Sequence, residues 1–290
     1  MGAIRSALSN TLRSLRRAPP RSGDPRPKTE RAGARARDSA GTGDAPARTE
    51  RGCVGAGEDA LERTRRDKFG VTFLVKICGI RECEMARVCV EAGATAVGVV
   101  LSPGSPRTTT LATALEIQST LPGGVACIAV VRDVSLGDPS LAMWTGSIQF
   151  HGRENALQIA QIVGANPQRA AQRSIIKAVS GSPSEILAWD FDPTIDAILV
   201  DGQAPGSGTA HDDAWLHILA TLRPRMQKPL ILAGGLTPES VARAIEIVRP
   251  SGVDVSSGVE SARGVKDAGL VRAFVTAALD AHASRPRDRD

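Results

Sequence analysis

From Val71 onward, short runs of apolar and β-branched residues alternate with longer stretches in which apolar positions recur at helical spacing. The short runs end at Gly, Pro or Asp, as buried strands do, and the longer stretches are typical of amphipathic helices. Strands are predicted at residues 71–77, 94–101, 125–131, 147–151, 174–179, 195–201, 229–234 and 252–258. Helices are predicted at residues 82–92, 110–121, 139–144, 154–163, 183–189, 213–222, 238–248 and 268–282. Thr237 and Pro238 are residue types that cap and begin a helix, so they are predicted to start the seventh one.

The alternation of these elements predicts the fold class. Eight strand and helix units in about 210 residues, with strands too apolar to face water, favour a closed (β/α)8 barrel, the TIM barrel. A doubly wound open sheet is the alternative. In a barrel the chemistry lies where strands end and loops begin. Functional residues are therefore expected at the carboxyl ends of the strands.

The first 70 residues have a different composition. Arg, Ala, Gly, Pro, Ser and Thr dominate them, and Phe69 is their single aromatic residue. Such a segment cannot bury enough apolar surface to offset its ordering entropy, so residues 1–70 are predicted to be a disordered basic extension. The barrel is predicted at 71–284 and a disordered C-terminus at 285–290. For the extension, the alternatives are a transit peptide, an N-myristoylation signal at MGAIRS, a binding arm, or non-coding sequence upstream of the true start.

Charge is distributed unevenly along the chain. Of a net +5, the first 70 residues contribute 16 Lys and Arg against 9 Asp and Glu, or +7, which leaves 20 basic and 22 acidic residues, or −2, for the body. The body therefore lacks the basic footprint of a nucleic-acid-binding domain. Its apolar runs stay far below the roughly 20 residues that a membrane span needs. A small-molecule substrate is predicted, with neither nucleic acid nor membrane as a partner.

The five cysteines, at positions 53, 78, 83, 89 and 127, form no CxxC pair and accompany no His-rich cluster. This pattern indicates neither a zinc site nor a disulfide framework, and no metal is predicted. Unpaired thiols favour a reducing compartment, so a cytoplasmic location is expected.

Two strand ends carry groups that exchange protons. Cys78 closes the first strand beside Lys76, and Asp201 closes the sixth strand, across the barrel mouth. A thiol and a carboxyl group on opposite sides of one pocket can act as base and acid on one substrate. Simpler interpretations exist for both, because a buried strand cysteine is often an inert hydrophobe and a strand-end aspartate is often a turn or capping residue.

Glycines follow the last two strands, as Gly234-Gly235 and as Ser257-Gly258. Glycine lets the backbone approach an anion closely, and successive N–H groups then supply the hydrogen-bond donors. Two such segments in consecutive units favour a phosphate site. The alternative is that these glycines only turn the chain.

Several motifs taken together resemble one family. They are KICGI at 76–80, SPGSPR at 102–107, QFHG at 149–152, Asp201 with GSG at 206–208, LAGGL at 232–236, and VDVSSGVE with GVKD between 253 and 267. In this order they look like phosphoribosylanthranilate isomerase, the tryptophan-pathway enzyme. The resemblance runs from Val75 to about Phe274 and does not include the basic extension.

The resemblance implies an Amadori rearrangement of N-(5-phosphoribosyl)anthranilate to 1-(2-carboxyphenylamino)-1-deoxyribulose 5-phosphate, with neither metal nor organic cofactor. It implies that Cys78 is the general base, that Asp201 is the general acid, and that Arg107 faces the anthranilate carboxylate. The protein is expected to be a monomer or a homodimer. The other residues expected to bind substrate are Lys76, Gln149, His151, Gly208, Gly234, Gly235, Ser256, Ser257 and Gly258.

The loop after Asp201 departs from the family pattern, because GSGTAHDDAW has His211 and Asp213 where the family has aromatic residues. Two other functions stay open: a non-catalytic barrel that binds a phosphorylated ligand, and another sugar-phosphate isomerase. A ribulose-phosphate epimerase would need metal-binding His and Asp residues that the strand ends lack. An indole-glycerol-phosphate synthase would need a Lys and Glu pair, and Lys177 has no obvious partner in the sequence.

Overall fold

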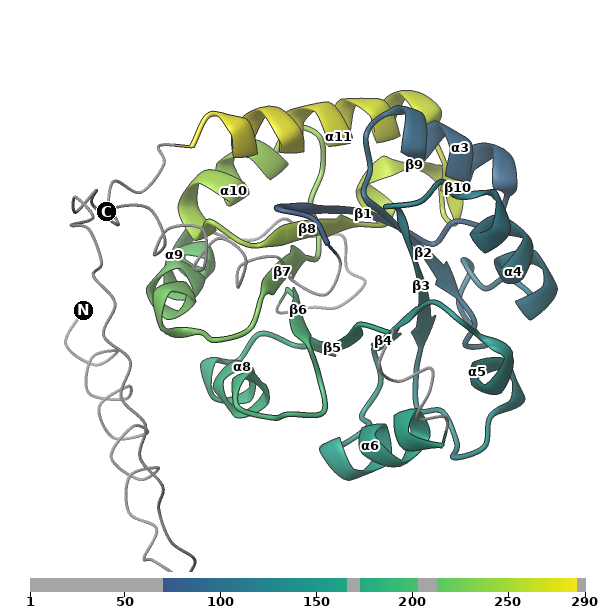
Figure 1. Cartoon of the computed structure of the whole chain (residues 1–290). Helices are drawn as coiled ribbons and strands as arrows, with labels where there is room; N and C mark the ends of the chain where they lie inside the picture. The colour runs from purple at the N-terminus through teal and green to yellow at the C-terminus, as the bar shows by residue number, and fades with distance from the viewer. Residues whose placement is uncertain (1–69, 166–172, 203–212, 286–290) are drawn as a thin grey trace, which may run out of the picture. The chain divides into compact units, whose positions relative to one another are not determined.

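The computed structural model describes residues 70–165, 173–202 and 213–285. Eight parallel strands, each next to its neighbour in the chain, form a closed barrel that helices surround (Figure 1). The strands are β1 (Leu74–Cys78), β2 (Ala96–Val100), β3 (Ala126–Val131), β4 (Ser147–Phe150), β5 (Ile175–Val179), β6 (Ala197–Asp201), β7 (Leu230–Ala233) and β8 (Gly252–Val255). The predicted barrel is confirmed. The open sheet is wrong, because β1 pairs with both β2 and β8 and so closes the ring.

The predicted terminal segments lie almost entirely outside the described residues. Of residues 1–70 the structure describes only Gly70, and of residues 285–290 only Arg285. The predicted boundaries at both ends, and the interpretations of the basic extension, therefore stay predictions.

Small and branched side chains fill the barrel interior. One buried cluster is formed by Leu74, Ala96, Ile128, Ile176, Ala178, Ala197, Leu199, Ile231 and Ala233. Side chains alternate between the two faces of a strand, so residues two positions beyond Leu74 and Leu199 also face the interior. These residues are Lys76 and Asp201. Polar groups thus replace apolar ones toward the carboxyl ends of β1 and β6.

The described helices are α3 (Cys83–Glu91), α4 (Leu111–Thr120), α5 (Pro139–Met143), α6 (Ala156–Gly164), α8 (Pro183–Asp190), α9 (Asp213–Leu222), α10 (Val241–Val248) and α11 (Ala268–Ala283). Local sequence explains where several of them begin. Asn155 and Gln158 form a reciprocal capping box at the start of α6. Asp138 and Ser182 cap α5 and α8, and in each case a proline follows in the first turn.

The start of α10 differs from the prediction. Ser240, not Thr237, precedes the first helical residue, Val241. Residues 237–240 form a separate turn, in which the Thr237 amide donates to Oγ of Ser240 at 2.9 Å and the Ser240 amide donates back to the Thr237 carbonyl at 3.2 Å. These local bonds hold the segment in a tight turn, so the regular helix begins three residues after Pro238.

The eighth strand is shorter than predicted. It ends at Val255, because Ser256 has φ −128° and ψ −81° and so leaves the extended conformation. A 3-10 turn, η2 (Ser257–Val259), follows it. A small antiparallel hairpin of β9 (Glu260–Ala262) and β10 (Val265–Lys266) comes next, and the sequence pattern did not predict it.

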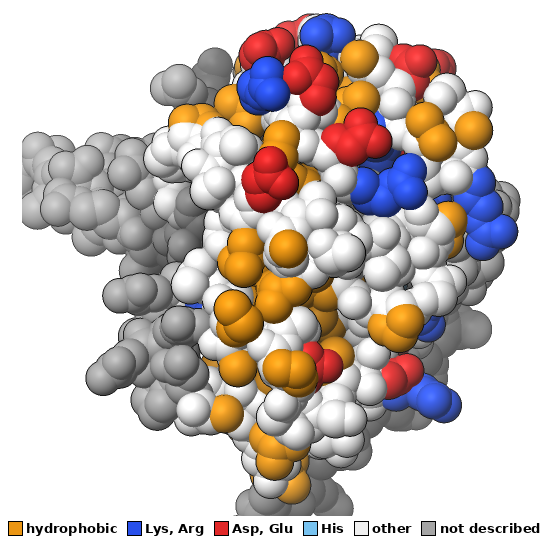
Figure 2. Space-filling view, turned by 90° about the vertical axis from the view of Figure 1, so that its right-hand side faces the viewer, with side chains coloured by type: hydrophobic (Ala, Val, Ile, Leu, Met, Phe, Trp, Pro, Cys, Tyr) orange, Lys and Arg blue, Asp and Glu red, His pale blue; other side chains and the backbone are white. Residues whose placement is uncertain are grey.

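The outer face formed by α3, α4 and α5 is divided between charged and apolar side chains. Figure 2 shows charged groups at the top of this face and hydrophobic ones gathered lower down. Large apolar side chains that stay exposed include Leu136, Met143 and Leu157, all near α5 and α6. In the described part of the chain, no helix is both long enough and apolar enough to cross a membrane.

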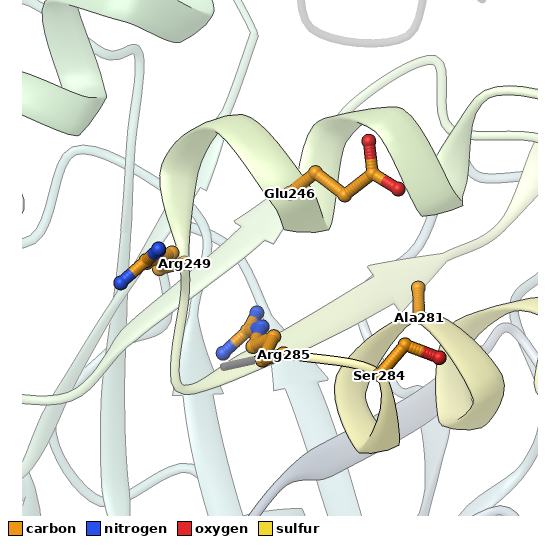
Figure 3. A pocket seen from close by; sticks show the side chains of 5 residues that line it. All are labelled: Glu246, Arg249, Ala281, Ser284 and Arg285. Carbon is orange, nitrogen blue, oxygen red and sulfur yellow. The ribbon is translucent and has the colours of Figure 1, made fainter. Parts of the chain in front are cut away.

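A cavity of about 280 Å³ lies between α10 and α11, lined by Glu246, Arg249, Ala281, Ser284 and Arg285 (Figure 3). It sits at the carboxyl ends of these helices, away from the carboxyl ends of the strands. The guanidinium of Arg285 donates to the carbonyls of Ile245 and Pro250 at 3.3 Å and lies over the Phe73 ring. Cations at a helix carboxyl end satisfy its carbonyl groups, so this cluster has a structural explanation.

Candidate active site

The mouth of the barrel, meaning the carboxyl-terminal end of its strands, contains most of the predicted site residues. Lys76 and Cys78 lie on β1 in the same inward phase as Leu74. Gly98 of β2 makes room for both, because a Cβ there would lie 2.9 Å from Sγ of Cys78 and 3.1 Å from Cε of Lys76. The small residue at position 98 thus allows the thiol and the ammonium group to share the interior.

Lys76 is fully buried below the thiol, and its Nζ donates to Oδ1 of Asp254 on β8 at 2.8 Å. Burial alone would lower the pKa of Lys76, but Asp254 and Cys78 outweigh burial, and the pKa is raised. The residue therefore stays an ammonium ion paired with a carboxylate. The predicted contact of Lys76 with substrate stays a prediction, because its ammonium group forms an ion pair with Asp254.

The thiol of Cys78 is also buried, and burial raises its pKa. Lys76 and Lys266 act in the opposite direction and lower that pKa, whereas Asp254 raises it. A general base must first lose its own proton, so nearby cations favour the form that catalysis needs. Cys89 and Cys127 are buried as well, and burial raises the pKa of each to about 12. Lys266 opposes this effect at Cys89 as it does at Cys78, but of these three thiols only Cys78 also interacts with Lys76 and Asp254.

Asp201 is held from two sides. Nε2 of His151 lies 3.1 Å from Oδ2 of Asp201, and Nε2 of Gln149 lies 3.0 Å from Nδ1 of His151. The Gln149 amide nitrogen only donates, so Nδ1 accepts and the imidazole proton sits on Nε2, directed at the carboxylate. Oδ1 of Asp201 lies against Gly234, where a Cβ would be 2.8 Å away. The predicted residues Gln149, His151 and Asp201 are thus brought into one chain of hydrogen bonds.

Asp254 connects the two halves of the mouth. Burial raises its pKa, Lys76 lowers it, and the charge of Asp201 raises it further. Asp254 therefore lies within electrostatic reach both of the β1 pair, Lys76 and Cys78, and of Asp201 on β6. The thiol and the carboxyl group that the sequence predicted as base and acid thus end β1 and β6 at the same end of the barrel, and both interact with Asp254.

Arg107, from the loop after β2, forms two hydrogen bonds to Glu260 of β9. Nε donates to Oε1 at 2.6 Å and one terminal nitrogen donates to Oε2 at 2.9 Å. Lys266 of β10 donates to the same Oε1 at 2.7 Å. Burial would raise the pKa of Glu260, but Arg107 and Lys266 outweigh it and lower the pKa to about 2. We call Arg107, Glu260 and Lys266 the Glu260 cluster.

The predicted phosphate segments pack against each other. Gly234 and Gly235 have φ angles of 85° and 63°, a conformation that L side chains rarely adopt. A Cβ at Gly258 would overlap the carbonyl oxygen of Leu236, so the loop after β8 lies directly on the loop after β7. Ser256 faces β1, where its Oγ donates to the carbonyl of Cys78 at 3.1 Å. The glycines are therefore needed for close backbone approach at the mouth, beside Asp201 and Cys78.

This packing predicts the effect of filling the space at Gly258. Gly258→Ala is expected to lower the free energy of unfolding by about 1–3 kcal/mol, because the new methyl group must displace the Leu236 backbone. It is also expected to weaken competitive inhibition by inorganic phosphate. Urea denaturation and steady-state inhibition measure the two effects. Gly123→Ala is the matched control, since no atom lies within 4 Å of a Cβ at Gly123. Equal behaviour of the two variants would contradict the packing argument.

Lys177 has a partner that the sequence did not reveal. Its Nζ lies 3.7 Å from Oε2 of Glu154 and donates to the carbonyl of Gly152 at 2.6 Å. Its strand neighbours Ile176 and Ala178 belong to the interior cluster, so Lys177 faces the helix layer, over the ring of Trp189. The pair therefore stabilises the loop after β4 instead of presenting a Lys and Glu pair inside the barrel.

Sequence reasoning missed three charged residues of the mouth: Asp254, Glu260 and Lys266. Asp254 could have been found from the sequence, because it is the only charged residue in an otherwise apolar strand. A buried carboxylate needs a cationic partner, and Lys76 is one that the sequence offers. Glu260 and Lys266 lie in motifs that were recognised but given no role. Gly208, predicted to bind substrate, lies outside the described residues, as does His211. Within the described ranges, no group of three or more His, Cys, Asp or Glu is arranged to hold a metal ion.

Comparison with known proteins identifies this arrangement. Residues 75–277 match the family described as N-(5'phosphoribosyl)anthranilate (PRA) isomerase. The chain is 38% identical over 216 residues to the N-(5'-phosphoribosyl)anthranilate isomerase of Paracoccus denitrificans, covering 70% of this chain and 96% of that relative.

Solved structures agree with this match. Phosphoribosyl anthranilate isomerase from Thermotoga maritima has a TM-score of 0.63 at 32% identity, and the match covers 72% of this chain and 99% of that one. A phosphoribosyl anthranilate isomerase in complex with reduced 1-(o-carboxyphenylamino)-1-deoxyribulose 5-phosphate has a TM-score of 0.60 at 32% identity, with the same coverage of 72% and 99%. This chain therefore belongs to the phosphoribosylanthranilate isomerase family, the isomerases of tryptophan biosynthesis.

Proposed function

We propose that this protein converts N-(5'-phosphoribosyl)anthranilate to 1-(2-carboxyphenylamino)-1-deoxyribulose 5-phosphate, with Cys78 as general base and Asp201 as general acid. The observation that carries the proposal is the position of these two groups. Cys78 is the last residue of β1, Asp201 is the last residue of β6, and both lie at the mouth within electrostatic reach of Asp254. Membership of the isomerase family supports the substrate class. The proposed reaction is an isomerisation, so it needs only proton transfers.

The chemistry begins at the ribose ring. A protonated Asp201 donates its proton to the ring oxygen, the bond between that oxygen and C1' breaks, and the anilino nitrogen forms a Schiff base with C1'. The Cys78 thiolate then takes the C2' proton, the electrons of that C–H bond form the C1'–C2' double bond, and the electrons of the C1'–N double bond return to the protonated nitrogen, which gives an enolamine. The enol proton is lost and C1' gains a proton, which gives the ketone. Acid and base must therefore be available to the same bound molecule.

His151 and Gln149 support the acid in this scheme. The Nε2–H of His151 fixes one oxygen of Asp201, and the Gly234 backbone lies against the other. Both contacts hold the carboxyl group in one orientation toward the mouth. The phosphate of the substrate is proposed to bind the backbone N–H groups of Gly234, Gly235, Ser257 and Gly258, where the loops after β7 and β8 meet.

Arg107 is proposed to bind the anthranilate carboxylate, which a planar guanidinium recognises through two parallel hydrogen bonds. In the structure Glu260 occupies two of its donors. Arg107→Lys keeps the charge but loses this fork, so KM is expected to rise about tenfold with a smaller change in kcat. Steady-state kinetics measure both constants. A KM equal to that of the wild type would show that the carboxylate binds elsewhere.

We infer a cytoplasmic location and a monomeric or homodimeric state. The described cysteines Cys78, Cys83, Cys89 and Cys127 are free thiols, which supports a reducing compartment. The exposed apolar residues Leu136, Met143 and Leu157 support contact with a second copy on that face, as in a homodimer. Light scattering of the purified chain decides between the two oligomeric states.

Turnover by purified protein tests the proposed function. Full-length protein is incubated with N-(5'-phosphoribosyl)anthranilate, and the ketose product is measured. Growth of a tryptophan auxotroph that lacks this isomerase provides a second test. A folded protein that binds the product analogue but fails in both tests would support a non-catalytic phospholigand barrel instead.

A further inference from the structure

The Glu260 cluster links the carboxylate-binding side of the mouth to the base. Glu260 and Lys266 come from the hairpin after β8, which lies outside the barrel, and each side chain is only 4% exposed. Gly264, in the turn of this hairpin, packs on Pro106, and the Gly264 amide donates to Oε2 of Glu260 at 3.0 Å. The hairpin is thus fixed to the loop that carries Arg107. This arrangement gives Lys266 a defined position.

Lys266 is two hydrogen bonds away from Cys78. Its Nζ donates to the carbonyl of Ser256 at 2.8 Å and approaches Oγ of Ser256 at 3.3 Å. That hydroxyl in turn donates to the carbonyl of Cys78 at 3.1 Å. Lys266 is therefore connected, through the hydroxyl of Ser256, to the backbone carbonyl of the residue that carries the thiol.

Given the proposed reaction, we propose that Lys266 is a positioning residue whose charge, held in place by Glu260 and Ser256, favours the thiolate form of Cys78. A larger ionised fraction of Cys78 makes the sulfur a better acceptor for the C2' proton. Arg107 binds the same carboxylate of Glu260, so the group proposed to recognise substrate and the group that activates the base share one anchor.

The electrostatics of the site agree with this role. Burial raises the pKa of Cys78, and Lys266 is one of two lysines that lower it. Burial lowers the pKa of Lys266 itself, and Glu260 opposes that effect, so Glu260 helps Lys266 to keep its charge. The charged or titratable groups around Cys78 are Lys76 on β1, Asp254 on β8, Lys266 on β10, Arg107 in the loop after β2, and, through these, Glu260, Asp201 and His151.

The test measures the thiolate without using substrate. Iodoacetamide reacts with the thiolate form, so at pH 8 the alkylation rate follows the ionised fraction of Cys78. Trypsin releases residues 77–81, which contain Cys78 as their single cysteine, and residues 82–87, which contain Cys83 and serve as an internal reference. Mass spectrometry of these peptides gives the rate at Cys78 for each protein.

Lys266→Met is expected to slow alkylation of Cys78 about tenfold, because removing a cation near a thiol lowers its ionised fraction. Lys266→Gln, which keeps polar contacts with Ser256 and Glu260, is a second uncharged variant and is expected to behave in the same way. Lys266→Arg retains the charge and is expected to restore most of the rate. Lys228→Met is the matched control, since Lys228 lies just before β7 at the other end of the barrel.

Circular dichroism and the thermal midpoint establish that each variant is folded. A folded Met or Gln variant with the wild-type alkylation rate would overturn the inference. An Arg variant as slow as the Met variant would also overturn it, because packing rather than charge would then be responsible. Alkylation does not depend on turnover, so a protein that shows these rates but fails to isomerise substrate would refute the proposed function and leave the role of Lys266 intact.

Discussion

Replacing Cys78 by serine is expected to lower kcat by about 10²- to 10⁴-fold, the usual contribution of a general base. A serine hydroxyl occupies nearly the same space beside Gly98 and Lys76, so the fold and KM are expected to change little. The hydroxyl is far less acidic than the thiol, and the cations of the mouth cannot ionise it at neutral pH. Steady-state kinetics with thermal unfolding of the same preparation measure these effects.

Cys83→Ser provides the control for this experiment. Cys83 begins α3, outside the barrel interior, and its replacement is expected to leave kcat unchanged. If Cys78→Ser had the same kcat as this control, the C2' proton would have to be removed by another group. The proposed role of Cys78 would then be wrong, whatever the family of the chain.

Asp201→Asn is expected to lower kcat to a similar extent, for a different reason. The amide oxygen can still accept from Nε2 of His151, so the geometry of the hydrogen-bond chain is retained. The amide cannot supply the proton that opens the ribose ring, so the first step becomes slow. Steady-state kinetics of the variant, with circular dichroism as a check of folding, measure this loss.

Asp192→Asn is the matched control for Asp201→Asn. Asp192 caps a turn before β6, where its carboxylate accepts from the Thr194 amide at 2.9 Å, at the end of the barrel away from the mouth. Its replacement is expected to have a small effect on stability and none on kcat. Full activity of Asp201→Asn would show that ring opening needs no carboxyl group at that position.

The fold could be predicted from the sequence because the signals that build a barrel are local. The apolar runs that end at Cys78 and at Asp201 are bounded by turn residues, and alternation along each strand determines which side chains face inward. The inward phase of β1 and β6 is enough to place a thiol and a carboxyl group at one mouth once the barrel is closed.

The Glu260 cluster could not be predicted in the same way. The hairpin of β9 and β10 has strands of three and two residues, too short for any periodic pattern. Arg107 and Glu260 are separated by 153 positions, and nothing in either local sequence indicates the partner. The late start of α10 has a similar cause, since the bonds of the turn between Thr237 and Ser240 decide the boundary.

The central claim is that Cys78 removes the C2' proton and that Asp201 opens the ring of the same bound substrate. Turnover of substrate deuterated at C2' tests it directly in the wild type, in Cys78→Ser and in Asp201→Asn. The isotope effect on kcat is expected to be largest in Cys78→Ser, where breaking the C2'–H bond becomes the slow step. It is expected to vanish in Asp201→Asn, where ring opening is slow. A full isotope effect in Asp201→Asn, or none in Cys78→Ser, would contradict the assignment.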